Sequence, residues 1–507
     1  MIFFSNLWNR KTIAAPNIFL GLAFCALSTN NIAASVNNDR DVKILLPTKD
    51  FTKAETYEAL PAGALTHKKI INANAFSHAS NNMSFERGLD FKLGNALFKR
   101  IWVSAPSSTQ TSDGLGPLFN SRACQRCHIK DGRGHPPASP EDNRISMLMR
   151  LSIPPANDKQ KKLLASHKKN SIDDPMYGGQ LQDHSVAGIS GEGRFDITYT
   201  EIKVALADNE TAWLRQPHYR FSQLNYGSLD KNIRVSPRIA PQMIGLGLLE
   251  AISEADIISH ADPDDKNNDG ISGKAQYVWS KEKQKPTLGR FGHKAGMPTL
   301  NEQNQAAFNG DIGLSTPLFP KGSGDCTPQQ AQCLAMPNGN SPQYNDLEVS
   351  KTMTDLVLHY TRNLAVPPRR NVNDPDVLAG KAIFYNNGCI DCHTPKFITP
   401  RNTAAIEQSR QLIWPYTDML LHDMGEDLAD NFTESMANGR EWRTPPLWGV
   451  GLTPVVNGHS FYLHDGRARN LLEAILWHGG EAEVSKNKVV NMTQRQRQQL
   501  IQFVESL

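Results

Sequence analysis

The stretch NGCIDCHTPKF, residues 387–397, places two cysteines and a histidine within five positions. The stretch RACQRCHIKDG, residues 122–132, repeats this Cys-x-x-Cys-His pattern earlier in the chain. Two thiols at this spacing on a helical turn can each add to a vinyl group of one haem, and the next histidine then lies under the iron as an axial ligand. The doubled pattern therefore predicts two covalently bound haem c groups, held by Cys124, Cys127 and His128 and by Cys389, Cys392 and His393.

Other uses of a Cys-x-x-Cys pair account for this pattern less well. Half of a zinc site needs a second Cys or His pair nearby, and neither unit has one within its loop. A redox-active dithiol does not require the histidine that follows each pair here. We therefore expect haem attachment at both units.

The N-terminus has the pattern of an export signal. Two basic residues precede a largely apolar run from residue 13 to 27, and small residues follow it. The run is too short to cross a membrane comfortably, and the bulky Phe24 makes Cys25 a poor lipidation site. We expect a signal peptide over residues 1–34 and a periplasmic protein without a membrane span.

An exported chain can also form disulfides. Cys326 and Cys333 lie in the Gly/Pro-rich stretch GDCTPQQAQCLAMPNG, which predicts a short disulfide loop, with two buried free thiols as the alternative. The formal net charge of +3 on 507 residues is too small to favour nucleic acid or an anionic membrane surface as a partner.

The residues around the second unit predict a pair of packed helices. An Asp-Pro pair at 374–375 is typical of a helix start, and Gly380 and Phe384 lie four apart just before the cysteines. A capping box at 493–496 begins a C-terminal helix with one apolar face. This pair resembles the terminal helices of class I cytochromes c, in which glycine permits a close crossing.

The first unit has a similar prelude, with Gly94 and Phe98 at the same spacing, but its cysteines follow only after a long loop. Between residues 133 and 370 the chain is rich in proline and glycine and has few long helical patterns. We predict a mainly α protein of two cytochrome c-like haem domains. Long loops and a few short strands enlarge the first, residues 35–368, and the second spans residues 369–507.

Three further motifs carry a family resemblance: GRFGHKAG at 289–296, RTPPLWGVG at 443–451 and FYLHDGRARNLLEAILWHGGEA at 461–482. With the two haem units they resemble the di-haem oxidoreductase family, a distant relative of the bacterial di-haem cytochrome c peroxidases. The resemblance implies a peroxidase-like enzyme, with electron entry at the C-terminal haem and reaction at the N-terminal haem. It also implies a small redox protein or cytochrome as electron partner and peroxide or another small oxidant as substrate. A di-haem electron carrier without enzymatic activity is the alternative.

Histidine placement supplies candidates for the distal iron ligands. His478 ends the helix NLLEAILWH and shares a face with apolar residues, which is also the pattern of a core histidine. By resemblance to the peroxidases this helix carries the distal ligand of the C-terminal haem. We therefore predict ligation of that iron by His393 and His478, with Met424 as the alternative. His464, in LHDGRA, is expected to support the loop beside the haem.

A peroxidase also needs an acid/base group beside its reactive haem. The candidates are Glu192 in ISGEGRF and Glu250 in GLGLLEAIS, and a solvated or ion-paired glutamate is the alternative for both. His184 and His293 are further residues that could approach the first haem, and the spacing does not decide between them. Other histidines lie in polar loops and are expected to be solvated: His67, His78, His135, His167 and His260.

The stretch DPDDKNNDGISG, residues 262–273, has the opening of a calcium loop. Asp265, Asn267 and Asp269 alternate before a glycine, as hard oxygen ligands do in such loops. Gln276 stands where a bidentate glutamate is expected, and an acidic turn is the alternative. Because di-haem peroxidases hold a calcium ion, the resemblance favours calcium as an additional cofactor.

Overall fold

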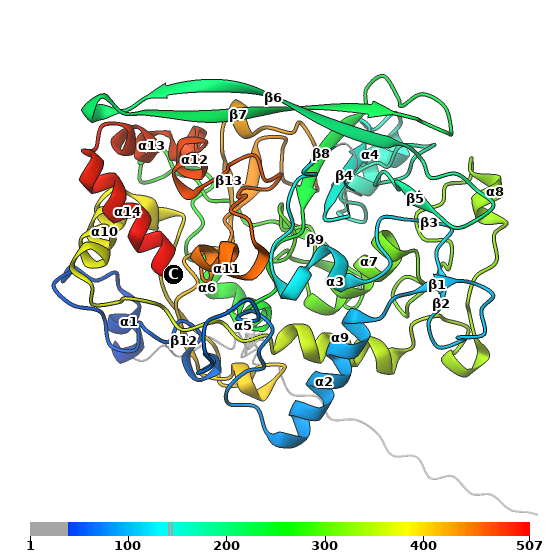
Figure 1. Cartoon of the computed structure of the whole chain (residues 1–507), viewed down its shortest axis with the longest axis horizontal. Helices are drawn as coiled ribbons and strands as arrows, with labels where there is room; N and C mark the ends of the chain where they lie inside the picture. The colour runs from blue at the N-terminus through cyan, green and yellow to red at the C-terminus, as the bar shows by residue number, and fades with distance from the viewer. Residues whose placement is uncertain (1–38, 140–141, 143–144) are drawn as a thin grey trace, which may run out of the picture.

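The computed structural model describes residues 39–507, apart from 140–141 and 143–144 (Figure 1). The predicted signal peptide lies outside the described residues. The α-helices described are α1 (Asp39–Leu45), α2 (Phe85–Lys99), α3 (Cys124–Cys127), α4 (Asp158–Ala165), α5 (Leu246–Ala251), α6 (Glu254–Ile258), α7 (Leu300–Ile312), α8 (Ala331–Leu334), α9 (Lys351–Arg362), α10 (Pro375–Asn386), α11 (Thr453–Asn457), α12 (Leu471–Leu476), α13 (Glu483–Val490) and α14 (Gln494–Ser506).

The strands pair two by two. They are β1 (Val103–Ser104), β2 (Asp113–Leu115), β3 (Leu118–Phe119), β4 (Met147–Ser152), β5 (His184–Ser185), β6 (Arg194–Ala205), β7 (Thr211–Ser222), β8 (Arg234–Ile239), β9 (Tyr277–Ser280), β10 (Lys285–Leu288), β11 (Phe397–Ile398), β12 (Leu412–Ile413), β13 (Leu421–Asp423) and β14 (Glu441–Arg443). In the described part of the chain they form seven two-stranded sheets.

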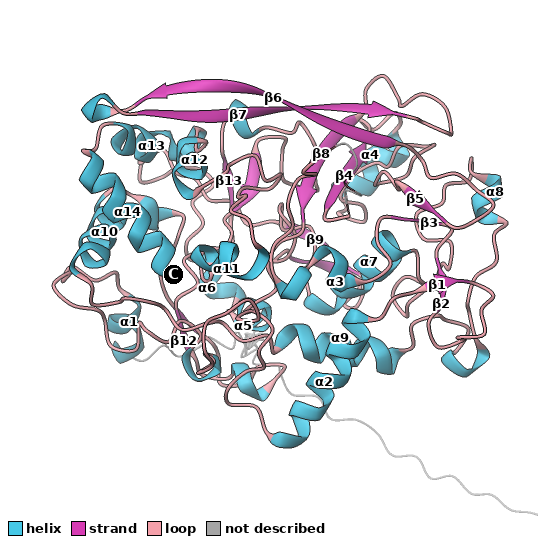
Figure 2. Ribbon diagram, in the orientation of Figure 1, coloured by secondary structure: helices cyan, strands magenta, loops and turns pink. Residues whose placement is uncertain are grey.

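This architecture corrects the predicted fold class. With 31% helix and 17% strand, the fold is mixed rather than mainly α (Figure 2). Much of the strand content comes from the long insertion that follows the first haem unit. There the first half of β6, residues 194–199, alternates polar and apolar side chains at the two-residue period of a half-exposed strand, which a search for helical patterns passes over.

Two pairs of helices cross closely, one in each half of the chain. α2 packs against α9, and α10 packs against α14. A Cβ atom on Gly94 would lie 2.2 Å from the carbonyl oxygen of Leu356, and one on Gly380 would lie 1.9 Å from that of Gln499. Only glycine allows backbones to approach so closely. The crossing expected in the second half is present, and the first half repeats it.

The repeat extends to the aromatic residues behind each haem-unit histidine. The ring centroid of Phe98 lies 6.2 Å from that of His128, and the centroid of Phe384 lies 6.1 Å from that of His393. Each phenylalanine also packs on an aromatic residue of the crossing helix, Tyr360 of α9 at 5.3 Å and Phe503 of α14 at 5.1 Å. The two haem units therefore stand on the same local framework.

Side chains cap the first turns of these four helices. Ser84, Ser350 and Asp374 accept hydrogen bonds from backbone N–H groups at the starts of α2, α9 and α10. Thr493 and Gln496 form the predicted capping box at the start of α14. Because the first N–H groups of a helix have no partner within it, these local residues fix where each helix begins.

The β6–β7 hairpin is a long ribbon that runs across the top of both halves in Figures 1 and 2. Leu206 and Leu214 at its far end belong to the hydrophobic core of the second half. Arg469 donates hydrogen bonds to the carboxylate of Glu201 at 2.9 Å and to the carbonyl oxygen of Trp213 at 2.6 Å. A segment that follows the first haem unit thus packs against the second half of the chain.

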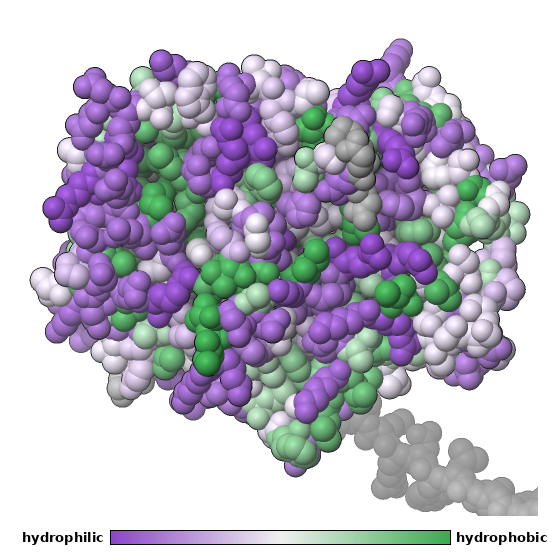
Figure 3. All heavy atoms as spheres, viewed as in Figure 1, coloured by the Kyte–Doolittle hydropathy of each residue, from purple (hydrophilic) through white to green (hydrophobic). Residues whose placement is uncertain are grey.

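The molecular surface is predominantly polar on the face drawn in Figure 3, with a short apolar strip near its centre. None of the helices in the described residues is both long and apolar enough to cross a membrane.

Candidate haem-binding site

Both Cys-x-x-Cys-His units open onto one cavity. It has a volume of about 530 Å³ and is lined by residues from both halves, including the six predicted attachment residues Cys124, Cys127, His128, Cys389, Cys392 and His393. All four cysteines are free thiols. The fold therefore brings into one space two units that are far apart in sequence.

The two histidines have matching environments. His128 Nδ1 lies 2.8 Å from the carbonyl oxygen of Pro241, and His393 Nδ1 lies 2.9 Å from that of Tyr416. Burial lowers the pKa of each imidazole to about 4, so both are neutral at pH 7. A neutral imidazole that donates through Nδ1 carries its lone pair on Nε2, which is the form that ligates a metal.

The thiols are neutral, with Cys127 buried and the other three half-buried. Burial raises the pKa of Cys124 and of Cys389 to about 12, and it also raises the pKa of Cys127 and Cys392. Redox-active Cys-x-x-Cys pairs have the opposite property, a lowered thiol pKa in an electropositive setting. The paired thiols beside neutral histidines in a shared cavity fit covalent haem attachment.

A half-buried arginine supports the same fit. Arg150 lines the cavity and bonds Gln180 Oε1 through Nη1, but its Nε is buried without a hydrogen-bond partner among the described residues. An unpaired guanidinium N–H that borders a cavity suits a ligand with carboxylate groups, and haem carries two.

His478 and Met424, the two predicted distal ligands, both line the cavity. His478 Nδ1 lies 2.7 Å from the carbonyl oxygen of Ala474, one turn earlier, so this histidine also presents Nε2 as its lone-pair nitrogen. The positive form of His478 would lower the pKa of His393, which places the two rings within electrostatic reach. Ligation by His393 and His478 stays a prediction, with Met424 still available.

A charged cluster beside Cys392 was not anticipated from the sequence. His422 is 3% exposed and lies between two carboxylates, with Nε2 2.7 Å from Asp418 Oδ2 and Nδ1 2.6 Å from Glu481 Oε2. Its Nδ1 is also 3.5 Å from the sulfur of Cys392. Although burial opposes the charge, the carboxylates raise the pKa of His422 well above 6.5, so it is an imidazolium at neutral pH. The sequence holds one signal for it, because Leu-His-Asp occurs at both 421–423 and 463–465.

The cavity wall between the units contains Trp442, on β14. The ring of His464 stacks on this indole with centroids 3.7 Å apart and planes 15° apart, and the ammonium of Lys294 lies 4.2 Å from the indole centroid. Asp465 forms a buried ion pair with Arg467 and accepts the Tyr219 hydroxyl, which holds the His464 loop in place. His464 thus lies beside the cavity, as a residue of the supporting loop would.

A chain of contacts connects the two attachment units through this wall. His128 bonds the carbonyl of Pro241, and two residues earlier the carbonyl of Ile239 lies 3.0 Å from His293 Nε2. The His293 ring stands edge-on to Trp442, with centroids 6.5 Å apart. Trp442 pairs with His422 across β13 and β14, and His422 touches Cys392.

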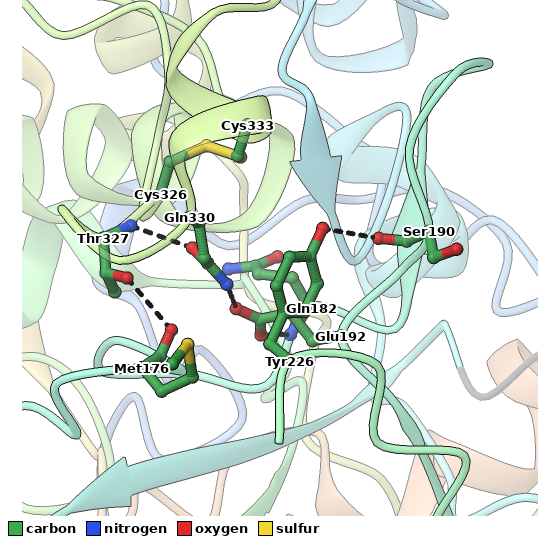
Figure 4. The surroundings of a disulfide bond; sticks show 9 residues. All are labelled: Met176, Gln182, Ser190, Glu192, Tyr226, Cys326, Thr327, Gln330 and Cys333. Carbon is green, nitrogen blue, oxygen red and sulfur yellow. Dashed lines mark hydrogen bonds between the residues drawn. A yellow bond between two sulfur atoms is a disulfide. The ribbon is translucent and has the colours of Figure 1, made fainter.

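The two predicted catalytic glutamates are engaged elsewhere. Glu192 is 1% exposed and accepts hydrogen bonds from Gln182 N and Gln330 Nε2, each at 2.6 Å, near the Cys326–Cys333 disulfide (Figure 4). Glu250 pairs with Arg362 and accepts from Leu300 N at 2.9 Å. Neither is among the residues that line the cavity. This placement gives no support to a catalytic role for either.

A different carboxylate does line the cavity. Asp311, half-buried near the end of α7, accepts a 2.9 Å hydrogen bond from Gln180 Nε2. Burial raises its pKa, and its negative charge raises the pKa of both Cys124 and Cys127, which places it beside the first unit. With Arg150 it forms a polar cluster on the wall of the first haem site. Nothing in the pattern around Asp311 distinguished it in the sequence.

Comparison with known proteins bears on the whole chain. Residues 61–507 match the model of a family described as "Di-haem oxidoreductase, putative peroxidase". The chain belongs to this di-haem oxidoreductase family. No curated protein matches it. Among solved structures, the hydrazine synthase of Kuenenia stuttgartiensis is similar at 14% identity with a TM-score of 0.25, over 70% of this chain and 90% of that one.

The structure confirms some of the remaining predictions for this di-haem oxidoreductase and contradicts others. The Cys326–Cys333 disulfide is confirmed. His184 stacks on Phe119 and is not among the cavity-lining residues. Of the histidines expected to be solvated, His260 is exposed, but His67 is only 2% exposed, because its loop folds into the core. That expectation was therefore wrong for His67, whose Nε2 bonds the carbonyl of Ala75.

The predicted calcium loop is a closed turn. Asp265 accepts hydrogen bonds from the backbone N–H groups of Asp269 and Gly270, and Asn267 Nδ2 donates to Asp269 Oδ2 at 2.8 Å. No three His, Cys, Asp or Glu side chains of the described residues are grouped to hold a metal ion. The side-chain oxygens thus serve the turn itself, and calcium binding stays a prediction.

Proposed function

We propose that this protein is an exported, periplasmic di-haem c-type oxidoreductase of peroxidase type. Electrons enter from a small redox protein or cytochrome at the C-terminal haem site, and peroxide is reduced at the N-terminal one. The observation that carries the proposal is the single cavity onto which both Cys-x-x-Cys-His units open. Export is supported by the N-terminal pattern and by the disulfide, which requires an oxidising compartment.

The two ends of the cavity differ in chemistry. The C-terminal end holds His478 and Met424, either of which would be able to ligate the iron of a bound haem. The N-terminal end holds the polar cluster of Asp311, Gln180 and Arg150. A site that passes electrons suits a closed, six-coordinate iron, whereas a site that reduces peroxide needs proton-transfer groups within reach.

Haem, when bound, supplies the one-electron chemistry at each site. The chain's own groups supply protons and positions. Reduction of hydrogen peroxide to two molecules of water consumes two electrons and two protons. Asp311 is proposed to take a proton from one peroxide oxygen and give it to the other, because burial raises the pKa of its carboxyl group and Gln180 fixes its orientation. Arg150 binds an anionic group, either of the haem or of the oxidant.

The attachment is tested first. The mass of the mature protein should exceed that of its polypeptide by two haem groups. Replacing Cys124 and Cys127 with alanine should remove one haem, and replacing Cys389 and Cys392 should remove the other. A mature mass equal to the bare chain would overturn the proposal at its root.

The reaction is tested with a reduced small cytochrome and hydrogen peroxide. Asp311→Asn is expected to lower turnover by about 10²–10⁴-fold, the range for loss of a general acid/base, while both haems stay bound. Glu192→Gln and Glu250→Gln are the matched carboxylate controls and should retain activity. Activity lost in a glutamate variant but kept in Asp311→Asn would return the acid role to that glutamate. If both irons stay low-spin in every redox state and peroxide changes nothing, the protein is an electron carrier.

A further inference from the structure

Trp442 has both faces covered by polar groups in a dry setting. The indole is 7% exposed, His464 stacks on it at 3.7 Å, and Lys294 Nζ lies 4.2 Å from its centroid. Two groups this close to one centroid cannot share a face, so the indole lies between them. The Lys294 side chain is fully buried. This arrangement is unusual because a lysine ammonium is seldom removed from water unless it is paired.

Lys294 keeps its charge through its partners. Its ammonium donates to Asp430 Oδ1 at 3.0 Å and to the carbonyl oxygen of Asn438 at 2.9 Å. Burial lowers the pKa of Lys294, and the Asp430 carboxylate opposes that shift. His464, on the other face, is neutral because burial lowers its pKa well below 6.5. The ring therefore faces the ammonium of a buried ion pair, and the Asp430 carboxylate offsets part of its charge. The ammonium, 4.2 Å from the indole centroid, stabilises the intact indole through a cation–π contact.

The indole proton has no base to receive it. Trp442 Nε1 donates a 3.0 Å hydrogen bond to the backbone carbonyl of Leu428. A backbone carbonyl accepts a hydrogen bond but does not take up a proton at neutral pH. If Trp442 lost an electron it would therefore have to stay a radical cation, in a low-dielectric site, 4.2 Å from an ammonium. Like charges at this distance repel strongly where water is excluded.

We propose that Lys294 keeps Trp442 reduced, so that electrons cross the indole between the two haem sites without leaving an oxidised tryptophan there. The inference rests on the proposed function, which makes this wall an electron path. In a two-step transfer the indole would lose one electron to the more oxidised site and later regain one from the other. With Lys294 in place one electron passes from one site to the other in a single step, and the indole neither gains nor loses charge. Lys294 acts through Trp442 and is in this sense a positioning residue.

The test measures tryptophan radical by electron paramagnetic resonance in frozen samples of the holoprotein. Lys294→Gln keeps hydrogen-bonding groups near Asp430 and Asn438 but removes the charge, and it is expected to accumulate roughly tenfold or more radical than the wild type. Lys294→Arg keeps the charge and should match the wild type. Lys294→Met combined with Asp430→Asn removes the charge without leaving an unpaired buried carboxylate, so it serves where the single variant folds poorly. Adding Trp442→Phe to either uncharged variant should abolish the signal.

Two oxidants separate this inference from the proposed function. Hydrogen peroxide acts through the haem site, whereas a photogenerated ruthenium(III) complex withdraws electrons without peroxide chemistry. Suppose that the ruthenium complex produces more tryptophan radical in the uncharged variants than in the wild type, and that peroxide produces none. This result would support the role of Lys294 and count against the peroxidase proposal. Trp448→Phe, a buried tryptophan outside the cavity lining, is the control and should not change the signal. Equal radical in wild type and uncharged variants with both oxidants, or abundant Trp442 radical in the wild type, would overturn the inference.

Discussion

Alanine at Gly94 and at Gly88, two glycines of the same helix, should have opposite effects on stability. A Cβ at position 94 would lie 2.2 Å from the Leu356 carbonyl oxygen and 2.7 Å from the Cβ of Tyr360, whereas one at position 88 has no neighbour within 4 Å. Alanine relieves the entropic cost of a helical glycine, about 0.5–1 kcal/mol. Overpacking costs about 1–3 kcal/mol. Gly94→Ala should therefore lose up to about 2.5 kcal/mol net, and Gly88→Ala should gain up to about 1 kcal/mol.

Reversible denaturation followed by far-ultraviolet circular dichroism measures both changes. A thermal midpoint shift of about 1–2 °C per kcal/mol is expected for a unit of about 330 residues. Because Tyr360 packs on Phe98 and Phe98 on His128, Gly94→Ala should also alter the visible spectrum of the first haem while leaving the second unchanged. Equal stability of the two variants would refute the argument that close helix approach requires this glycine.

Three further predictions concern the second half and the turn at 262–273. Interaction with His422 lowers the pKa of Glu481 from 4.5 to about 2, so the stability it contributes is present above pH 4.5 and lost as pH falls toward 2. The free energy of unfolding should thus fall more steeply between these values in the wild type than in Glu481→Gln, and parallel curves would contradict the pairing. His478→Met should change the low-spin electron paramagnetic resonance signal expected of bis-histidine iron. It should also raise the reduction potential of the C-terminal haem, because a thioether favours ferrous iron, and an unchanged spectrum would favour Met424 as the ligand. Metal analysis should find near-stoichiometric calcium in the wild-type protein and none in Asp265→Asn. A wild-type protein without calcium would end the calcium hypothesis.

What the sequence predicted correctly was encoded locally. The Cys326–Cys333 disulfide, which the structure confirms, closes a short loop. Each Cys-x-x-Cys-His unit spans only five consecutive residues, and haem attachment at these units stays a prediction. The start of α14 follows from a capping box, and the crossing of α10 from one glycine. The disulfide and the capping box each join residues that are near in the chain. The glycine belongs to a short local pattern that is typical of one kind of helix crossing.

What the sequence did not reveal depends on distant segments. α9 carries a strong amphipathic pattern, but its partner α2 lies far upstream, so its role as the closing helix of the first half could not be read locally. Glu192 and Glu250 looked available because their partners, Gln330 and Arg362, come from other parts of the chain. Asp311 has no motif around it, and only the fold places it beside the first unit.

The β6–β7 ribbon bears on the timing of electron transfer. It extends from one half of the protein and is anchored to the other by the Leu206 and Leu214 core contacts, by Arg469 and by Arg497, which pairs with Glu210 at its tip. Halves tied in this way cannot swing apart to adjust the gap between their haems. Transfer between the two sites should then proceed at a rate independent of solvent viscosity, and thickening the medium with glycerol should slow only the encounter with the external electron donor.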